Sequence, residues 1–198
     1  MRLRADKMAP YTVTEADVLW LARAVEAEGA IQSQVAATLV NGFCFQRSRG
    51  QSRDLATFVR AYAQPVNPRW YPLGDLYLRD LEGKTPSELK QATAAAERRA
   101  AVHSARTTFS AGTREAVIAA LNGRATIPPT ATDYAAPEID ATGKGYTPLV
   151  PPIAGRNRLW ARPGAETWAG YVVDATDAWP WLVGVVLLGF AAWRWWVV

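Results

Sequence analysis

The chain of 198 residues is long enough for one domain with a sizeable core. Its 49% hydrophobic and 20% charged residues exclude disorder over most of its length. The basic residues behind the net charge of +4 are scattered, so no nucleic-acid partner is expected. A mild positive balance suits anionic polymers such as cell-wall glycans, or lipid headgroups.

Cysteine and histidine occur once each, at Cys44 and His103. A single cysteine excludes an internal disulfide, and the phenylalanines on either side of Cys44 indicate a buried thiol. A Cys–His nucleophile pair is formally open, but no local motif supports it. One histidine and one cysteine leave no metal constellation, so neither a metal nor a cofactor is expected.

The first helix is predicted over residues 15–28, because Thr14 with Asp17 is typical of an N-cap and a capping-box variant. At 100° per residue, Glu28 lies at the edge of the helix's apolar stripe, whereas Glu26 lies further round toward the polar side. The stripe consists of Val18, Leu21, Ala22 and Val25. Glu28 is therefore placed for partial desolvation.

A second helix is expected over residues 31–41, with Asn41-Gly42 as its stop signal. A third begins after Ser52 and Asp54 and ends at Pro65. Its apolar residues recur at helical spacing: Leu55, Phe58, Val59 and Tyr62. The prolines around Trp70 and Tyr71 then predict a loop.

The segment Thr85-Pro86-Ser87-Glu88 is a strong helix start, and the alanine-rich run after it predicts a helix to about residue 106. Thr113 is expected to cap a further helix that Asn122-Gly123 closes. Residues 124–156 are rich in proline and glycine and are expected to be irregular. Residues 157–173 alternate well enough for a short β-hairpin, with Pro163-Gly164 near its turn.

The C-terminal run 178–198 differs from the rest of the chain. It has an apolar centre without charge from Trp181 to Trp193, and Arg194 is its one basic residue. A membrane-spanning helix needs about 20 apolar residues with aromatic residues at both interfaces, which this run just reaches. Burial in a protein assembly is the alternative. The anchor residues expected at its two ends are Trp179, Trp181, Trp193, Arg194, Trp195 and Trp196.

These patterns predict a mainly α fold with a short β-hairpin and a C-terminal hydrophobic helix. The expected division is an N-terminal arm over residues 1–13, the main domain over 14–172 and the anchor over 178–198. The N-terminal arm has basic residues without a following apolar run, so no signal peptide is predicted.

Four segments in order resemble the cell-wall hydrolases of the spore-cortex-lytic type, which also occur in phages. "LARAVEAEGA" followed by "QSQVAATLVNGF" is similar to the family's acid-bearing helix and its Gln-led second helix. "ATFVRAYAQPVNPRWY" is similar to its "VV-x-QP-x-x-F/W" segment, and "DYAAP" and "NRLWARPG" look like weak copies of its closing pieces. Three departures stand out: a shorter loop between Glu28 and Gln32, Gly42 in place of the usual Arg, and Tyr134 where a His is common.

The resemblance implies a small lysozyme- or transglycosylase-like helical domain with Glu28 as general acid and then base. Burial raises the pKa of a carboxyl, which suits an acid that must stay protonated near neutral pH. A helix-cap role or an ion pair with an arginine is the structural alternative for Glu28. Since no second carboxylate has a clear claim, the pattern suits lytic transglycosylase chemistry more than a two-carboxylate hydrolase.

The candidate substrate-binding residues are Gln32, Asn41, Trp70, Tyr71 and Asp75. The two aromatic rings offer flat apolar faces for sugar stacking, although packing within their proline-rich loop is equally open. Gln32 and Asn41 can bind glycan or orient Glu28, or can serve as helix-cap or surface groups. Asp75 follows the aromatic loop and would be the first candidate for a base.

The leading hypothesis is therefore a peptidoglycan-cleaving enzyme, of lytic transglycosylase or muramidase type, carried in a phage particle for local wall opening during genome entry. Its expected partners are peptidoglycan and, through the C-terminal helix, a membrane or a hydrophobic virion assembly, in which the chain can be oligomeric. One alternative is a structural or membrane-spanning virion component with a degenerate hydrolase fold. Another is a bacterial inner-membrane protein with an unrelated helical domain.

Overall fold

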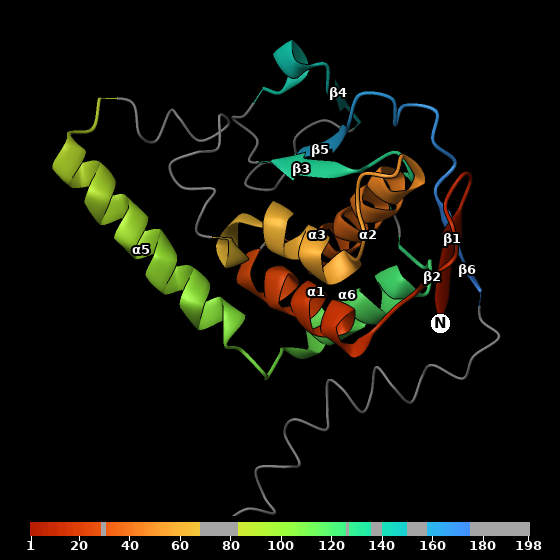
Figure 1. Ribbon diagram of the computed structural model, residues 1–198, viewed down its shortest axis with the longest axis horizontal. Coiled ribbons are helices and arrows are strands. Elements are labelled where there is room, and N and C mark those ends of the chain that lie inside the picture. Colours follow the sequence, from red (N-terminus) through yellow and green to blue (C-terminus); the bar gives the residue numbers. More distant parts are fainter. Residues whose placement is uncertain (29–30, 68–82, 126, 136–139, 150–157, 175–198) are drawn as a thin grey trace, which may run out of the picture.

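A computed structural model describes residues 1–28, 31–67, 83–125, 127–135, 140–149 and 158–174 (Figure 1). About half of these residues are helical and the strands are short, so the chain is mainly α, as predicted. The α-helices are α1 (Glu15–Glu28), α2 (Gln32–Ser48), α3 (Leu55–Tyr62), α5 (Pro86–Ser104) and α6 (Ala111–Leu121). Two 3-10 helices, η1 (Gln64–Val66) and η3 (Thr142–Lys144), lie in the connections.

The strands form two small antiparallel sheets. One has the order β2-β1-β6, built from β1 (Arg2–Ala5), β2 (Tyr11–Thr12) and β6 (Tyr171–Asp174). The other has the order β3-β5-β4, built from β3 (Asp133–Ala135), β4 (Thr147–Pro148) and β5 (Arg158–Ala161). The two sheets lie at different sides of the helices, and α5 lies along a further flank, in contact with η1 and α1 (Figure 1).

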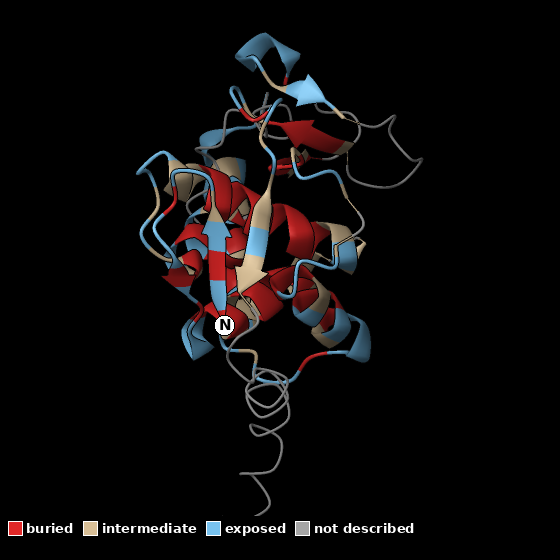
Figure 2. Ribbon diagram, turned by 90° about the vertical axis from the view of Figure 1, so that its right-hand side faces the viewer, coloured by how far each residue is buried: buried red, intermediate tan, exposed pale blue. Residues whose placement is uncertain are grey.

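Helix α2 is the centre of the core. Every residue from Val35 to Phe45 is buried, because α1, α3, α6, β1 and β3 all pack around it. A helix that is apolar on all sides must be enclosed in this way. Figure 2 shows the buried residues concentrated in the helices at the middle of the molecule. The thiol of Cys44 is fully buried among them, as predicted.

The predicted stop of the second helix at Asn41-Gly42 is wrong, because α2 continues to Ser48. A Cβ on Gly42 would lie 2.6 Å from the carbonyl oxygen of Thr132, so glycine here permits a close approach between α2 and the segment before β3. The Asn41 amide donates to the carbonyl oxygens of Pro128 (3.3 Å) and Ala131 (3.1 Å). Asn41 and Gly42 therefore fix the position of the segment before β3 against α2.

The start of α1 is confirmed, and Asp17 does more than cap it. Its Oδ2 accepts from the Thr14 backbone (2.7 Å) and hydroxyl (2.8 Å) and from the Tyr11 hydroxyl (2.7 Å). Its Oδ1 accepts from the backbone N–H of Ala56 in the first turn of α3 (2.8 Å). A single buried carboxylate thus satisfies unpaired donors at the starts of two helices, which explains why α1 and α3 pack side by side.

The starts of the later helices are confirmed in part. Thr85 and Glu88 form the predicted capping box at the start of α5. Helix α6, however, begins at Ala111 and not after Thr113, because Ser110 is its N-cap and accepts from the Thr113 backbone (3.2 Å). The prediction missed this turn because Gly112 disfavours a helix on propensity alone.

The predicted β-hairpin over residues 157–173 is wrong. β5 pairs with β3 and β4, whereas β6 pairs with β1 across almost the whole chain. The supposed N-terminal arm is consequently part of a sheet, with Leu3 fully buried, and the supposedly irregular part contains β3, β4 and η3. Gly164, with φ of +84°, still turns the chain after β5. Alternation identified the strands but carries no information about their partners.

Within the ranges that the structure describes, no helix is both long and apolar enough to cross a membrane. The C-terminal run 178–198, on which the anchor was predicted, lies outside those ranges.

Candidate functional site

Glu28 is the last residue of α1, and its side chain is half-buried. Burial raises the pKa of its carboxyl above the ordinary value, and the hydrogen bond that it accepts from the Tyr134 hydroxyl only partly opposes that rise. The Tyr134 oxygen lies 2.6 Å from Glu28 Oε1. Among the described residues Glu28 has no ion pair, so the structural alternative of a pair with an arginine is not what the structure shows.

Tyr134 reaches Glu28 because of the second sheet. In this sheet Tyr134 of β3 is paired with Leu159 of β5, which is buried. The Tyr134 ring also meets the ring of Tyr62 edge to face, with centroids 6.2 Å apart. Two segments of the family resemblance thus contribute the paired strands β3 and β5, and β3 carries Tyr134 to the predicted acid.

A buried ion pair holds β3 in this position. Arg162 donates to both carboxylate oxygens of Asp133, at 2.7 and 3.1 Å. The Tyr62 hydroxyl donates to Asp133 Oδ1 (2.6 Å) and the Thr132 hydroxyl to Oδ2 (2.9 Å). Burial raises the pKa of the Tyr62 hydroxyl well above its ordinary value, so it stays a donor. The Asp133 carboxylate is therefore neutralised by Arg162 and is not a free base.

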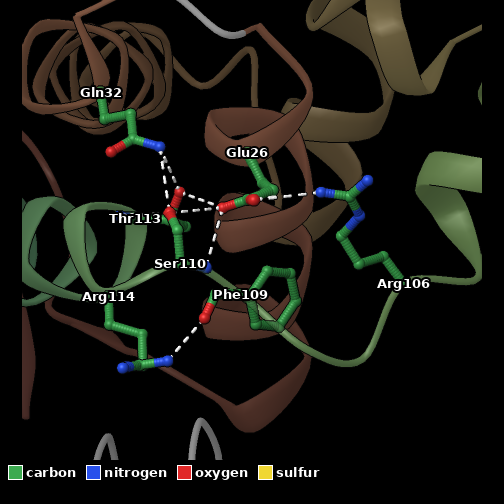
Figure 3. A network of polar contacts seen from close by, with 7 residues as sticks. All are labelled: Glu26, Gln32, Arg106, Phe109, Ser110, Thr113 and Arg114. Carbon is green, nitrogen blue, oxygen red and sulfur yellow. Dashed lines mark hydrogen bonds and ion pairs between the residues drawn. The ribbon is translucent and has the colours of Figure 1, made fainter.

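Glu26 belongs to a separate network at the start of α6 (Figure 3). Its Oε2 accepts from the backbone (3.1 Å) and hydroxyl (2.9 Å) of Ser110 and from the Thr113 hydroxyl (2.5 Å), and its Oε1 accepts from Arg106 (3.1 Å). Burial alone would raise the pKa of Glu26, but these donors and the arginine charge hold it below the ordinary value. The charged form of Glu26 is thus favoured at a helix N-terminus, where negative charge is stabilised.

Two carboxylates two residues apart on one helix therefore have opposite environments. Glu26 is held in its charged form, whereas burial favours the neutral, protonated form of Glu28. A carboxyl whose pKa is raised by burial, as that of Glu28 is, is typical of general acids. Of the two, Glu28 is the carboxyl whose protonated form is favoured.

The predicted substrate-binding residues are dispersed. Gln32 donates from Nε2 to the hydroxyls of Thr113 (2.8 Å) and Ser110 (3.3 Å), so it supports the α6 start seen in Figure 3. Asn41 is buried and bonded to backbone carbonyls, as described above. The side-chain hydrogen bonds of Gln32 and Asn41 thus go to groups other than Glu28. Trp70, Tyr71 and Asp75, and the whole predicted anchor from Trp179 to Trp196, lie outside the described residues.

Sequence reasoning missed the residues that hold the strand of Tyr134 in place: Tyr62, Asp133 and Arg162. Tyr62 was predicted only as part of an apolar stripe, and Arg162 only as part of a loosely matching segment. The one available signal was Tyr134, which replaces the family's usual histidine. A polar residue at that position indicates a contact with the acid, but its partner 106 residues away could not be inferred from spacing.

No family model matches the chain, and no curated protein or solved structure shows significant similarity to it.

The bond between Tyr134 and Glu28 has a measurable consequence. Replacing Tyr134 with phenylalanine removes a donor that stabilises the charged carboxylate, so we expect the Glu28 pKa to rise further. An NMR titration of the side-chain carboxyl carbons, with Glu28→Gln for assignment, measures this pKa. Tyr171→Phe, which removes a hydroxyl from the other sheet, is the matched control and should leave the value unchanged. A Glu28 pKa that stays constant or falls in Tyr134→Phe would contradict the role of this bond.

Proposed function

We propose that the chain cleaves the glycan strands of peptidoglycan, and that its described part is a small lysozyme- or transglycosylase-like helical domain. The observation that carries the proposal is Glu28: a half-buried carboxyl with a raised pKa, bonded to a phenol and without an ion-pair partner among the described residues. General acid catalysis of glycoside cleavage needs a carboxyl that stays protonated near the working pH.

In the proposed reaction Glu28 donates its proton to the glycosidic oxygen, and the bond from that oxygen to the anomeric carbon breaks. The Glu28 carboxylate then takes the proton of the muramic 6-hydroxyl as its oxygen closes on the anomeric carbon. This route needs no second carboxylate, which agrees with the neutralisation of Asp133 by Arg162 and with the capping role of Glu26. A muramidase would use water in the second step and would need a base to activate it.

The proposal includes delivery in a phage particle for local wall opening during genome entry. Its support is the composition of the run 178–198, whose apolar centre suits a membrane or a hydrophobic virion assembly. The bacterial inner membrane is the alternative location for the same run.

The products identify the reaction. We expect purified sacculi treated with the full-length chain to release 1,6-anhydro-muropeptides without a reducing end, recognised by mass spectrometry. Products heavier by one water would indicate hydrolysis, and Asp75 would then be the first residue to replace in search of a base. Heat-treated protein is the control for release that does not depend on the folded chain.

The alternative is a structural virion component that keeps a degenerate hydrolase fold. The observation that favours it is the occupation of Glu28 Oε1 by the Tyr134 hydroxyl, which competes with a substrate oxygen for the carboxyl. A folded full-length chain that leaves sacculi intact at every pH from acid to neutral would support this alternative and remove the enzymatic proposal.

A further inference from the structure

A pocket of about 680 Å³ lies between α5 and the surface formed by α1, α3 and η1. Its α5 wall consists of small side chains, Ala100, Ala101 and Ser104, with Glu97 one turn earlier. Larger residues at these positions would fill the space between α5 and the bundle, so the alanine-rich sequence of α5 is the reason that the pocket exists. The flank on which α5 lies is visible in Figure 1.

The opposite wall carries an aromatic ring with two cations. The guanidinium groups of Arg23 and Arg60 lie over the Trp20 ring, with their carbons 4.7 and 4.8 Å from its centroid. Arg23 does not line the pocket, and its Nε donates to the carbonyl oxygen of Arg106 (3.0 Å). Arg60 lines the pocket and, among the described residues, has no carboxylate partner.

Glu97 lines the same pocket from α5 and is exposed. It makes no ion pair with any described residue, Arg60 included. The pocket is therefore lined by a guanidinium from α3 and a carboxylate from α5, neither of which is paired with a described residue, and by the indole on which the guanidinium lies. Such a set is complementary to a ligand that carries both a carboxylate and an amino group, and Glu97 disfavours a purely anionic one.

We infer that this pocket binds the peptide stem of peptidoglycan. Arg60 binds a stem carboxylate through its planar guanidinium, which the Trp20 ring supports, and Glu97 accepts from the amino group of a diamino acid. The inference rests on the proposed function for the identity of the peptide. It extends that function, because an enzyme with this pocket binds the peptide attached to the strand as well as the glycan.

The spacing along α1 agrees with this assignment. Trp20 and Glu28 are eight residues apart on the same helix, which at 1.5 Å per residue separates them by roughly 12 Å along its axis. An extended stem of three or four residues covers about 10–14 Å. An extended stem attached to the muramic residue at Glu28 thus covers the axial separation between Glu28 and Trp20.

The test is calorimetric titration of the full-length chain with the free stem tetrapeptide that contains meso-diaminopimelate. Arg60→Gln should weaken binding roughly ten- to a hundredfold, the equivalent of one lost charged hydrogen-bonding group. Ala101→Leu, at an exposed position on the pocket rim, should block binding through the added volume. Arg98→Gln removes the same charge from an exposed site on α5 outside the lining and should bind as the unmodified chain does.

Glu28→Gln separates this inference from the proposed function. It should bind the free tetrapeptide with unchanged affinity, because the pocket does not contain Glu28. If the chain fails to cleave sacculi yet binds the peptide in an Arg60-dependent manner, the pocket assignment stands and the enzymatic proposal falls. If the unmodified chain does not bind at millimolar peptide, or if Arg60→Gln and Ala101→Leu both bind normally, the pocket assignment is wrong whatever the lytic activity.

Discussion

Glu28→Gln should reduce release of soluble muropeptides from sacculi by roughly 10²–10⁴-fold, the usual contribution of a positioned general acid. Glutamine keeps the shape of the side chain and an oxygen that can accept from Tyr134, but it has no proton to give to the glycosidic oxygen. Burial disfavours the charged form of Glu28, as its raised pKa shows, so a neutral replacement should not destabilise the fold at neutral pH. Muropeptide release followed by turbidity and chromatography measures the loss.

Glu115→Gln is the matched control, because Glu115 is an exposed carboxylate on α6 that makes no hydrogen bond or ion pair with its side chain to a described residue. It should retain full activity, and both variants should show the circular dichroism and melting curve of the unmodified chain. Activity of Glu28→Gln within a few-fold of the unmodified chain would remove Glu28 from the mechanism.

The activity of the unmodified chain should also fall as the pH rises through the Glu28 pKa. Glu28 can act as an acid only while it is protonated. Because burial raises its pKa, it stays protonated up to a higher pH than an exposed glutamate does. In Tyr134→Phe the Glu28 pKa should rise further, so the pH above which activity falls should rise with it.

Arg162→Met should lower the free energy of unfolding by about 3–5 kcal/mol, the usual cost of leaving one member of a buried ion pair alone. The side chains of Arg162 and Asp133 are 18% and 7% exposed, so solvent can compensate little of the lost charge. Arg162 binds both oxygens of Asp133, and Asp133 also accepts from Tyr62 and Thr132. Urea denaturation followed by tryptophan fluorescence measures the change.

The double variant Asp133→Asn with Arg162→Met should recover much of this loss, because it leaves no charge unpaired. Arg124→Met, at an exposed position outside the site, is the control for loss of one arginine and should change stability by less than about 0.5 kcal/mol. A single Arg162→Met variant as stable as this control would show that the ion pair does not hold β3.

Local signals in the sequence were sufficient for the starts of α1, α3 and α5, but not for that of α6. Thr14 with Asp17, Asp54, and Thr85 with Glu88 each place an acceptor within three residues of the backbone donors that it satisfies. Such caps depend only on near neighbours in the chain, so they can be identified without knowledge of the fold. The same applies to Glu28, whose position at the edge of an apolar stripe predicted its desolvation.

The end of α2 was decided by packing. Asn41-Gly42 is a common end of a helix, but here the segment before β3 lies against Gly42 and accepts from Asn41. These contacts, together with burial of every residue up to Phe45, outweigh the local preference for a stop. The partners of β5 and β6 were decided in the same way, because pairing depends on which strand completes each buried face.

The sequence by itself determined the starts of α1, α3 and α5, the mainly α class, the burial of Cys44 and the one carboxyl placed to become partly desolvated. Only the tertiary structure decided that Glu26 caps α6, that Tyr134 meets Glu28 from 106 residues away, and that Arg162 neutralises Asp133. The physical reason is that capping and periodicity involve residues within about one or two helical turns. The charge state of a carboxyl, in contrast, is set by whichever groups the whole fold brings within hydrogen-bonding distance.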